Sequence, residues 1–174
     1  MSGAATEKKG DKPSGTAFDR AVRILASRRQ TTVEIRRKLQ QRGYEKPEIE
    51  AALDRLGDLR YIDDAAATRD WADELARTGG QGKQKALQKL IKRGLDPEQC
   101  RRELDRAWDD ELEQEHAQAV LGKLLRSTPG LAGTSKGRAK LWRSLLNRGF
   151  RGEIVRRLLQ ALPGTEMDDS AYME

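Results

Sequence analysis

Residues 31–43 read Thr-Thr-Val-Glu-Ile-Arg-Arg-Lys-Leu-Gln-Gln-Arg-Gly, and the pattern of this stretch returns at residues 82–94 and 137–149. Each copy ends in an Arg-Gly pair, and the three glycines are 51 and 55 positions apart. Apolar residues stand eight and four positions before each glycine, which places them on one face of a helix. Glycine readily adopts the left-handed conformation that ends a helix. Each copy is therefore predicted to be an amphipathic helix that ends at its glycine.

Apolar residues also recur six and ten positions after each glycine, which predicts a second helix in each copy. The aligned apolar columns are Ile35, Ala86 and Leu141; Leu39, Leu90 and Leu145; Ile49, Cys100 and Val155; and Leu53, Leu104 and Leu159. A further helix precedes each copy, at about 17–28, 64–77 and 110–127, and no stretch alternates with a period of two for long enough to form a strand.

The fold class predicted from this repeat is all-α. Three tandem three-helix repeats, helix-turn-helix-like, are expected at residues 17–60, 61–108 and 109–162, and together they should form an elongated modular body. Residues 1–16 and 163–174 are rich in Gly, Pro, Ser and Thr and lack apolar periodicity, so both tails are predicted to be disordered.

The composition argues against several classes of protein. No apolar run approaches 18 residues, and the N-terminus has no apolar segment of the signal-peptide kind. A single cysteine cannot form an internal disulfide, which favours a cytoplasmic protein. One histidine and one cysteine leave little for a metal site or an activated nucleophile, so no catalytic residue, metal or cofactor is expected. A site built from carboxylates alone stays open.

Charge is unevenly distributed along the chain. The net charge is +6 overall, but residues 17–162 carry +9 and residues 163–174 carry −4. The three predicted repeats carry +4, +1 and +4. A basic body suggests an anionic partner such as nucleic acid or an acidic protein surface. The alternative, that helices rich in Lys, Arg and Glu are simply well solvated, is equally compatible with the composition.

The candidate binding residues are cations on or beside the Arg-Gly helices. They are Lys83, Lys85, Lys89, Lys92 and Arg93 in the second repeat, Arg138, Lys140, Arg143 and Arg148 in the third, and Arg36, Arg37 and Arg42 in the first. Lysines at 85, 89 and 92 should form one stripe, able to contact DNA phosphates or an acidic protein surface. The stripe is alternatively a solvated helix face, and the arginine before each glycine is alternatively a cap for carbonyls at the helix C-terminus.

The order of short motifs resembles that of the RecX regulators of the bacterial recombinase RecA, over residues 17–162. The motifs are Thr31, Glu34, Ile35 and Leu39, then Leu59-Arg60-Tyr61-Ile62-Asp63-Asp64, Gly79-Gly80-Gln81-Gly82-Lys83, Leu90-Ile91-Lys92-Arg93-Gly94-Leu95 and Lys136-Gly137-Arg138. Arg60 departs from the family pattern, which usually has glycine before the tyrosine. Tyr61 itself is expected to pack at the junction of the first two repeats.

The resemblance implies a regulator without catalysis of its own. Such a protein would bind RecA and RecA–DNA filaments, inhibit the recombinase, ATPase and co-protease activities, and so modulate DNA repair, recombination and the SOS response. Single- and double-stranded DNA would be weaker partners, no membrane would be involved, and the chain would be a monomer. The alternative is a stand-alone helical DNA-binding module without a protein target, and an enzyme is the third and least favoured hypothesis.

Overall fold

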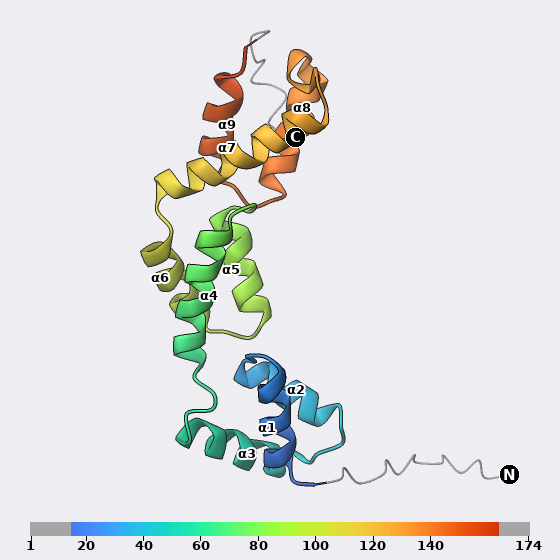
Figure 1. The fold of residues 1–174 in the computed structure, drawn as a ribbon, viewed down its shortest axis with the longest axis vertical. Coiled ribbons are helices and arrows are strands. Elements are labelled where there is room, and N and C mark those ends of the chain that lie inside the picture. Colours follow the sequence, from blue (N-terminus) through green and yellow to red (C-terminus); the bar gives the residue numbers. More distant parts are fainter. Residues whose placement is uncertain (1–14, 164–174) are drawn as a thin grey trace, which may run out of the picture. The chain divides into compact units, whose positions relative to one another are not determined.

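The computed structural model describes residues 15–163, which are helices and the connections between them, with no strand in that range. The predicted all-α fold class is confirmed (Figure 1). Disorder is predicted for residues 1–16 and 163–174. Of these positions the structure describes 15, 16 and 163, and the others lie outside the described residues.

The helices follow one another in three sets of three. The first set is α1 (Ala17–Ser27), α2 (Thr32–Gln40) and α3 (Lys46–Asp58); the second is α4 (Asp64–Thr78), α5 (Lys83–Lys92) and α6 (Pro97–Ala107); the third is α7 (Asp110–Ser127), α8 (Ser135–Leu146) and α9 (Gly152–Gln160). A short 3₁₀ turn, η1 (Leu131–Gly133), lies in the long connection between α7 and α8. The predicted boundaries at 60/61 and 108/109 fall between α3 and α4 and between α6 and α7.

The chain divides into two compact units. Among the described residues, the first unit comprises 15–67 together with 93–95, and the second comprises 68–92 and 96–163. The first helix set thus lies in the first unit, and the third set lies in the second unit with α5 and α6.

The predicted helix starts are made by side-chain caps. Thr31 Oγ1 accepts a hydrogen bond from the Glu34 backbone at 3.1 Å, and the Thr31 backbone donates to the Glu34 carboxylate at 3.1 Å, which completes the capping box at α2. Asp96 accepts from the Gln99 backbone at 2.7 Å, and Pro97 is the first residue of α6. Caps of this kind stabilise a helix by about 1 kcal/mol each.

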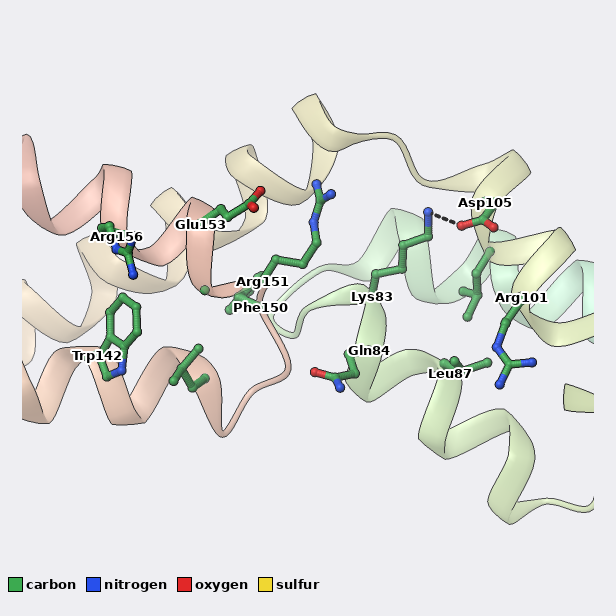
Figure 2. Close-up of a pocket in the computed structure, with 13 residues that line it drawn as sticks. Lys83, Gln84, Leu87, Arg101, Asp105, Trp142, Phe150, Arg151, Glu153 and Arg156 are labelled. Atoms are coloured by element: carbon green, nitrogen blue, oxygen red, sulfur yellow. Dashed lines mark ion pairs between the residues drawn. The ribbon is translucent and has the colours of Figure 1, made fainter. Parts of the chain in front are cut away.

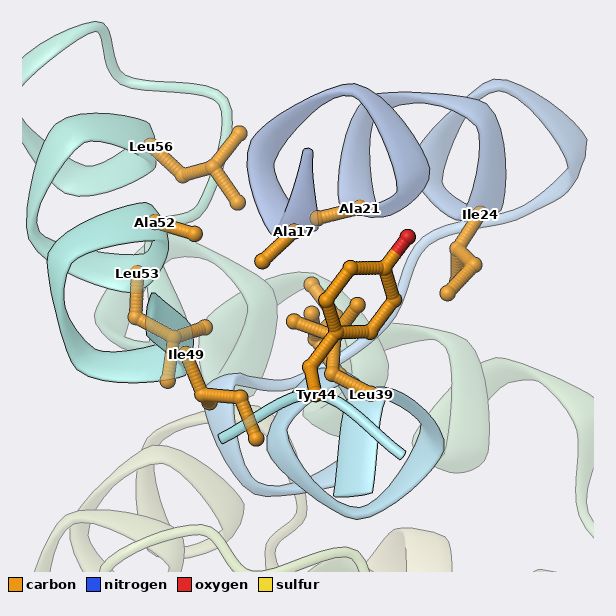
Figure 3. Packing of buried hydrophobic residues seen from close by; sticks show 10 residues of the cluster. Ala17, Ala21, Ile24, Leu39, Tyr44, Ile49, Ala52, Leu53 and Leu56 are labelled. Carbon is orange, nitrogen blue, oxygen red and sulfur yellow. The ribbon is translucent and has the colours of Figure 1, made fainter. Parts of the chain in front are cut away.

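The aligned apolar columns form the cores. All twelve of their side chains are buried, at 6% exposure or less. In the first unit they pack with residues of α1 around Tyr44 (Figure 3). The residue after each Arg-Gly pair forms a further buried column that the sequence reading missed: Tyr44, Leu95 and Phe150. An apolar residue after the left-handed glycine commonly packs back on the helix that it ends, and this rule could have identified the column.

Within residues 15–163 no helix is both long enough and apolar enough to cross a membrane. The same residues contain no group of three His, Cys, Asp or Glu side chains placed to hold a metal ion. Cys100 is fully buried in its column, and burial raises the pKa of its thiol.

Candidate nucleic-acid interface

Three lysines on α5 form a row that no acidic side chain compensates. Lys85, Lys89 and Lys92 are exposed and have no ion pair among the residues that the structure describes. Ala86 and Leu90 hold another face of α5 in the core. Like charges four positions apart destabilise a helix by about 0.2–0.5 kcal/mol, so this α5 lysine row costs free energy unless an anion binds to it. Phosphate or carboxylate groups are the ligands that it suits.

The other two Arg-Gly helices carry smaller counterparts of this row. On α8, Lys140 and Arg143 are exposed without an ion pair in the described part of the chain, and Arg37 is in the same situation on α2. The sequence patterns had suggested twelve cations. Six of them make neither an ion pair nor a side-chain hydrogen bond within residues 15–163: Lys85, Lys89, Lys92, Lys140, Arg143 and Arg37.

The structure gives Lys83 and Arg36 partners inside their own units. Lys83 Nζ lies 2.6 Å from Asp105 Oδ1 and donates to the Trp108 carbonyl at 2.8 Å. Arg36 makes a two-pronged contact with the Glu50 carboxylate, with both N–O distances 2.9 Å. These two cations are therefore engaged in holding α5 to α6 and α2 to α3.

Arg138 is a buried structural residue of the third helix set. Its side chain is only 4% exposed. The guanidinium donates to the carbonyls of Ala132, Leu159, Leu162 and Pro163 at 2.8 to 3.2 Å. The Ala132 carbonyl belongs to η1, the Leu159 carbonyl to the last turn of α9, and the other two to the residues that follow α9. A helix leaves the backbone acceptors of its last turn without partners. Arg138 therefore joins the start of α8 to both segments.

The three arginines that precede glycine do not share one role. Arg42 donates to the Lys38 carbonyl at 3.1 Å, and Arg148 donates to the Ser144 carbonyl at 2.8 Å, so both cap the helix that they end. Arg93 instead pairs within the first unit with Glu34, at 3.0 Å for both contacts. Burial opposes ionisation of that carboxyl, but the hydrogen bonds from Arg93 and the Thr31 backbone hold the pKa of Glu34 below its ordinary value.

A groove in the second unit is lined by residues of α5, α6, α8 and α9 (Figure 2). Its volume is about 1100 Å³, and its apolar lining consists of Leu87, Leu104, Trp142, Leu146 and Phe150. Most of its cations are already paired: Lys83 with Asp105, Arg101 with Glu98, and Arg151 with Asp110. Compensated cations bind phosphate poorly, so the α5 lysine row is the better phosphate site.

The sequence reading missed the buried carboxylate that positions Arg151 beside this groove. Glu113 is fully buried, and it accepts from the Arg151 backbone at 3.3 Å and from Arg151 Nε at 3.0 Å. Glu113 lies four and seven positions before Ala117 and Val120 on α7. An acidic residue within that apolar stripe is the signal that could have revealed a buried ion pair.

Comparison with known proteins identifies the family of the chain. The model described as RecX, first three-helix domain, matches residues 17–56, and that of RecX, third three-helix domain, matches residues 110–159. Regulatory protein RecX of Chlorobaculum tepidum is 32% identical over 159 residues, which cover 91% of this chain and 96% of that protein. The chain belongs to the RecX family. A RecX regulatory protein of Pseudomonas fluorescens is 34% identical over 152 residues, 86% of this chain and 91% of the relative.

Solved RecX structures share the fold. The crystal structure of RecX from Lactobacillus salivarius superposes with a TM-score of 0.71 at 22% identity, covering 83% of this chain and 92% of that one. The three-helix organisation found here is thus that of the RecX family, whose matched relatives are named regulatory proteins.

Proposed function

We propose that this RecX-family chain binds RecA filaments on DNA and inhibits the recombinase, ATPase and co-protease activities of RecA, without catalysis of its own. It acts as a cytoplasmic monomer of three repeats, at residues 17–60, 61–108 and 109–162. The single observation that carries the proposal is the α5 lysine row, which is exposed and uncompensated within the described residues. The membership of the chain in a family of regulatory proteins supports it.

The row and its counterparts suit a partner that repeats. Five of the uncompensated cations are Lys85, Lys89, Lys92, Lys140 and Arg143. A filament of protein and DNA presents phosphates and acidic side chains at regular intervals, so several weak contacts combine through effective concentration. If all five cations contacted phosphates of a single strand, log K would fall with log salt by a slope of about −3.5.

The test measures RecA ATPase and strand exchange on single-stranded DNA with increasing amounts of the chain. The variant K85E/K89E reverses two charges of the α5 lysine row. The control K46E/K123E reverses two exposed lysines that also lack an ion pair in the described residues and lie on α3 and α7. We expect the concentration for half-inhibition to rise at least about tenfold in K85E/K89E and to stay within about twofold in the control.

Two results would overturn the proposal. In the first, a modest excess of the chain leaves both rates unchanged and does not co-sediment with the filament. In the second, K46E/K123E loses as much inhibition as K85E/K89E, which would reduce the effect to net charge. The lysines of both pairs are exposed, so the two variants should unfold at the same temperature as each other. This control shows that any difference in inhibition does not come from a difference in stability.

One comparison of affinities distinguishes the proposed function from the alternative of a stand-alone DNA-binding module. At a single salt concentration, the chain is titrated with bare DNA and with RecA filament on the same DNA. Tighter binding to the filament supports the proposed function, and equal or tighter binding to bare DNA supports the module.

A further inference from the structure

The turn that ends α3 holds an arginine in a conformation that favours glycine. Arg60 has φ 56°, and no other non-glycine residue within residues 15–163 has a positive φ. Its backbone donates to the Gly57 carbonyl at 2.9 Å, and the Tyr61 backbone donates to the Leu56 carbonyl at 2.9 Å. These two hydrogen bonds form the Schellman motif, with Arg60 at the left-handed position.

An arginine at this position costs the fold free energy. The left-handed conformation is about 1–2 kcal/mol less favourable for a residue with a Cβ atom than for glycine. The equivalent turns after α2 and α8 place Gly43 and Gly149 there, with φ 81° and 82°. The Arg60 side chain is exposed and has no ion pair or hydrogen bond to the described residues that would offset this cost. Strain of this kind points to a function outside the fold itself.

The apolar side chains of the same turn face solvent. Tyr61 is 58% exposed and Leu59 is 51% exposed. The predicted packing of Tyr61 between the first two repeats is therefore wrong in this structure; the next residue, Ile62, packs against the core of the first unit instead. In the Arg-Gly turns the corresponding residue is buried, as Tyr44 and Phe150 are.

A shallow hollow adjoins the exposed ring. Its volume is about 440 Å³, and it is lined by Phe18, Asp19, Val22, Arg23, Arg55, Leu59 and Tyr61. The Arg55 guanidinium lies over the Phe18 ring at 4.2 Å, a cation–π contact that keeps its charge beside the hollow. The one carboxylate of the lining, on Asp19, accepts a hydrogen bond from the Thr16 hydroxyl at 2.7 Å.

We propose that this hollow, which Tyr61 lines and Arg60 precedes in the chain, binds unpaired bases of a single-stranded nucleic acid. An exposed tyrosine ring offers a stacking platform, and stacking of one base on an aromatic ring contributes about 1–3 kcal/mol. Arg23, Arg55 and Arg60 supply cations for the flanking phosphates, which matches the charge of the ligand. The bases of a duplex are stacked within the helix and do not reach such a ring. This site lies in the first unit, is separate from the α5 lysine row, and needs no recombinase.

The test uses the whole chain, labelled oligo-dT of 20 nucleotides and a duplex of equal length, at low salt and without RecA. We expect Y61A to weaken single-strand binding about tenfold and duplex binding by less than twofold, as measured by fluorescence anisotropy. Y61W, which keeps a stacking surface, should bind the single strand at least as tightly as the parent chain. The effect of Y61A should persist in the K85E/K89E background, because the two sites are separate.

The variant R60G separates a ligand site from a structural role. Glycine relieves the strained φ and removes one cation, so thermal unfolding should occur at the same or a higher temperature while single-strand affinity falls about threefold. The proposal is overturned if Y61A binds the single strand with the affinity of the parent chain. It is also overturned if Y61A loses the same amount of affinity for the single strand and for the duplex. If Y61A weakens RecA-filament binding alone, the hollow binds protein and the nucleic-acid assignment is wrong.

Discussion

The substitution Gly82→Ala should destabilise the second unit strongly, because two backbone segments cross at this residue without room for a side chain. A Cβ atom at Gly82 would lie 2.1 Å from the carbonyl oxygen of Gly149 and 2.3 Å from the backbone nitrogen of Phe150. The Gly82 backbone also donates to the Arg148 carbonyl at 2.8 Å. Gly149 faces the same constraint, since its own Cβ would lie 2.5 Å from the Lys85 nitrogen.

The expected loss follows from these contacts. The clash involves backbone atoms, which cannot rotate away as a side chain can, so the segments must separate by more than about 1 Å. Overpacking of this kind costs about 1–3 kcal/mol, and the lost hydrogen bond adds about 1 kcal/mol. The free energy of unfolding should fall by about 2–4 kcal/mol. For a unit of this size, each kcal/mol lowers Tm by about 4–8 °C.

Tryptophan fluorescence in urea measures this unit selectively. The three tryptophans of the chain, Trp71, Trp108 and Trp142, all lie in the second unit. Gly57→Ala in α3 is the control, because nothing lies within 4 Å of the added Cβ and alanine favours a helix by about 1 kcal/mol. It should leave the tryptophan transition unchanged. A Gly82→Ala transition within about 0.5 kcal/mol of the parent would refute the reasoning, since it would mean that the crossing can open at little cost.

Three further expectations concern buried or paired ionisable groups. Arg138→Met removes every hydrogen bond of a buried guanidinium and should lower the free energy of unfolding in urea by about 2–4 kcal/mol, whereas a loss below about 0.5 kcal/mol would contradict its structural role. Burial lowers the pKa of His116, against the attraction of neighbouring carboxylates, so stability of the second unit should be complete above about pH 6.5 and fall below it. The variant H116Q should remove that part of the pH dependence in fluorescence-detected unfolding. Burial opposes ionisation of Glu34, but hydrogen bonds from Arg93 lower its pKa, so the stability that this carboxylate contributes should be present above about pH 4.5 and lost as the pH falls through the lowered value. In E34Q, unfolding followed by circular dichroism should show less loss of stability at acid pH. The same loss of stability at acid pH in E34Q and the parent chain would contradict this.

The fold was predictable because its signals are local. The columns led by Ile35 and Leu39 need only the helical period, and the caps at Thr31 and Asp96 need only the residues within one turn. The buried column that includes Tyr44 also has a local signal, but it lies between the two helices of each copy, where helical periodicity does not apply.

The sequence predicted which cations lie on or beside the Arg-Gly helices, but not which of them remain without a partner. Lysine stripes and Arg-Gly pairs look alike in sequence, but Arg42 caps its own helix while Arg93 pairs with Glu34, 59 positions away. The exposure of Tyr61 depends on the left-handed turn at Arg60. In the sequence, this turn is marked only by an arginine where the family pattern usually has glycine.

The sequence by itself determined the all-α class, the three helix sets and the residues of their cores, since periodicity and capping act within a few positions. Only the tertiary structure decided which cations stay available to a ligand. Lys83 meets Asp105 and Arg36 meets Glu50 only after the helices pack, whereas Lys85 and Lys89 gain no such partner in the described residues. Charge compensation acts through space and is set by side chains far apart in the chain, so no local pattern contains it.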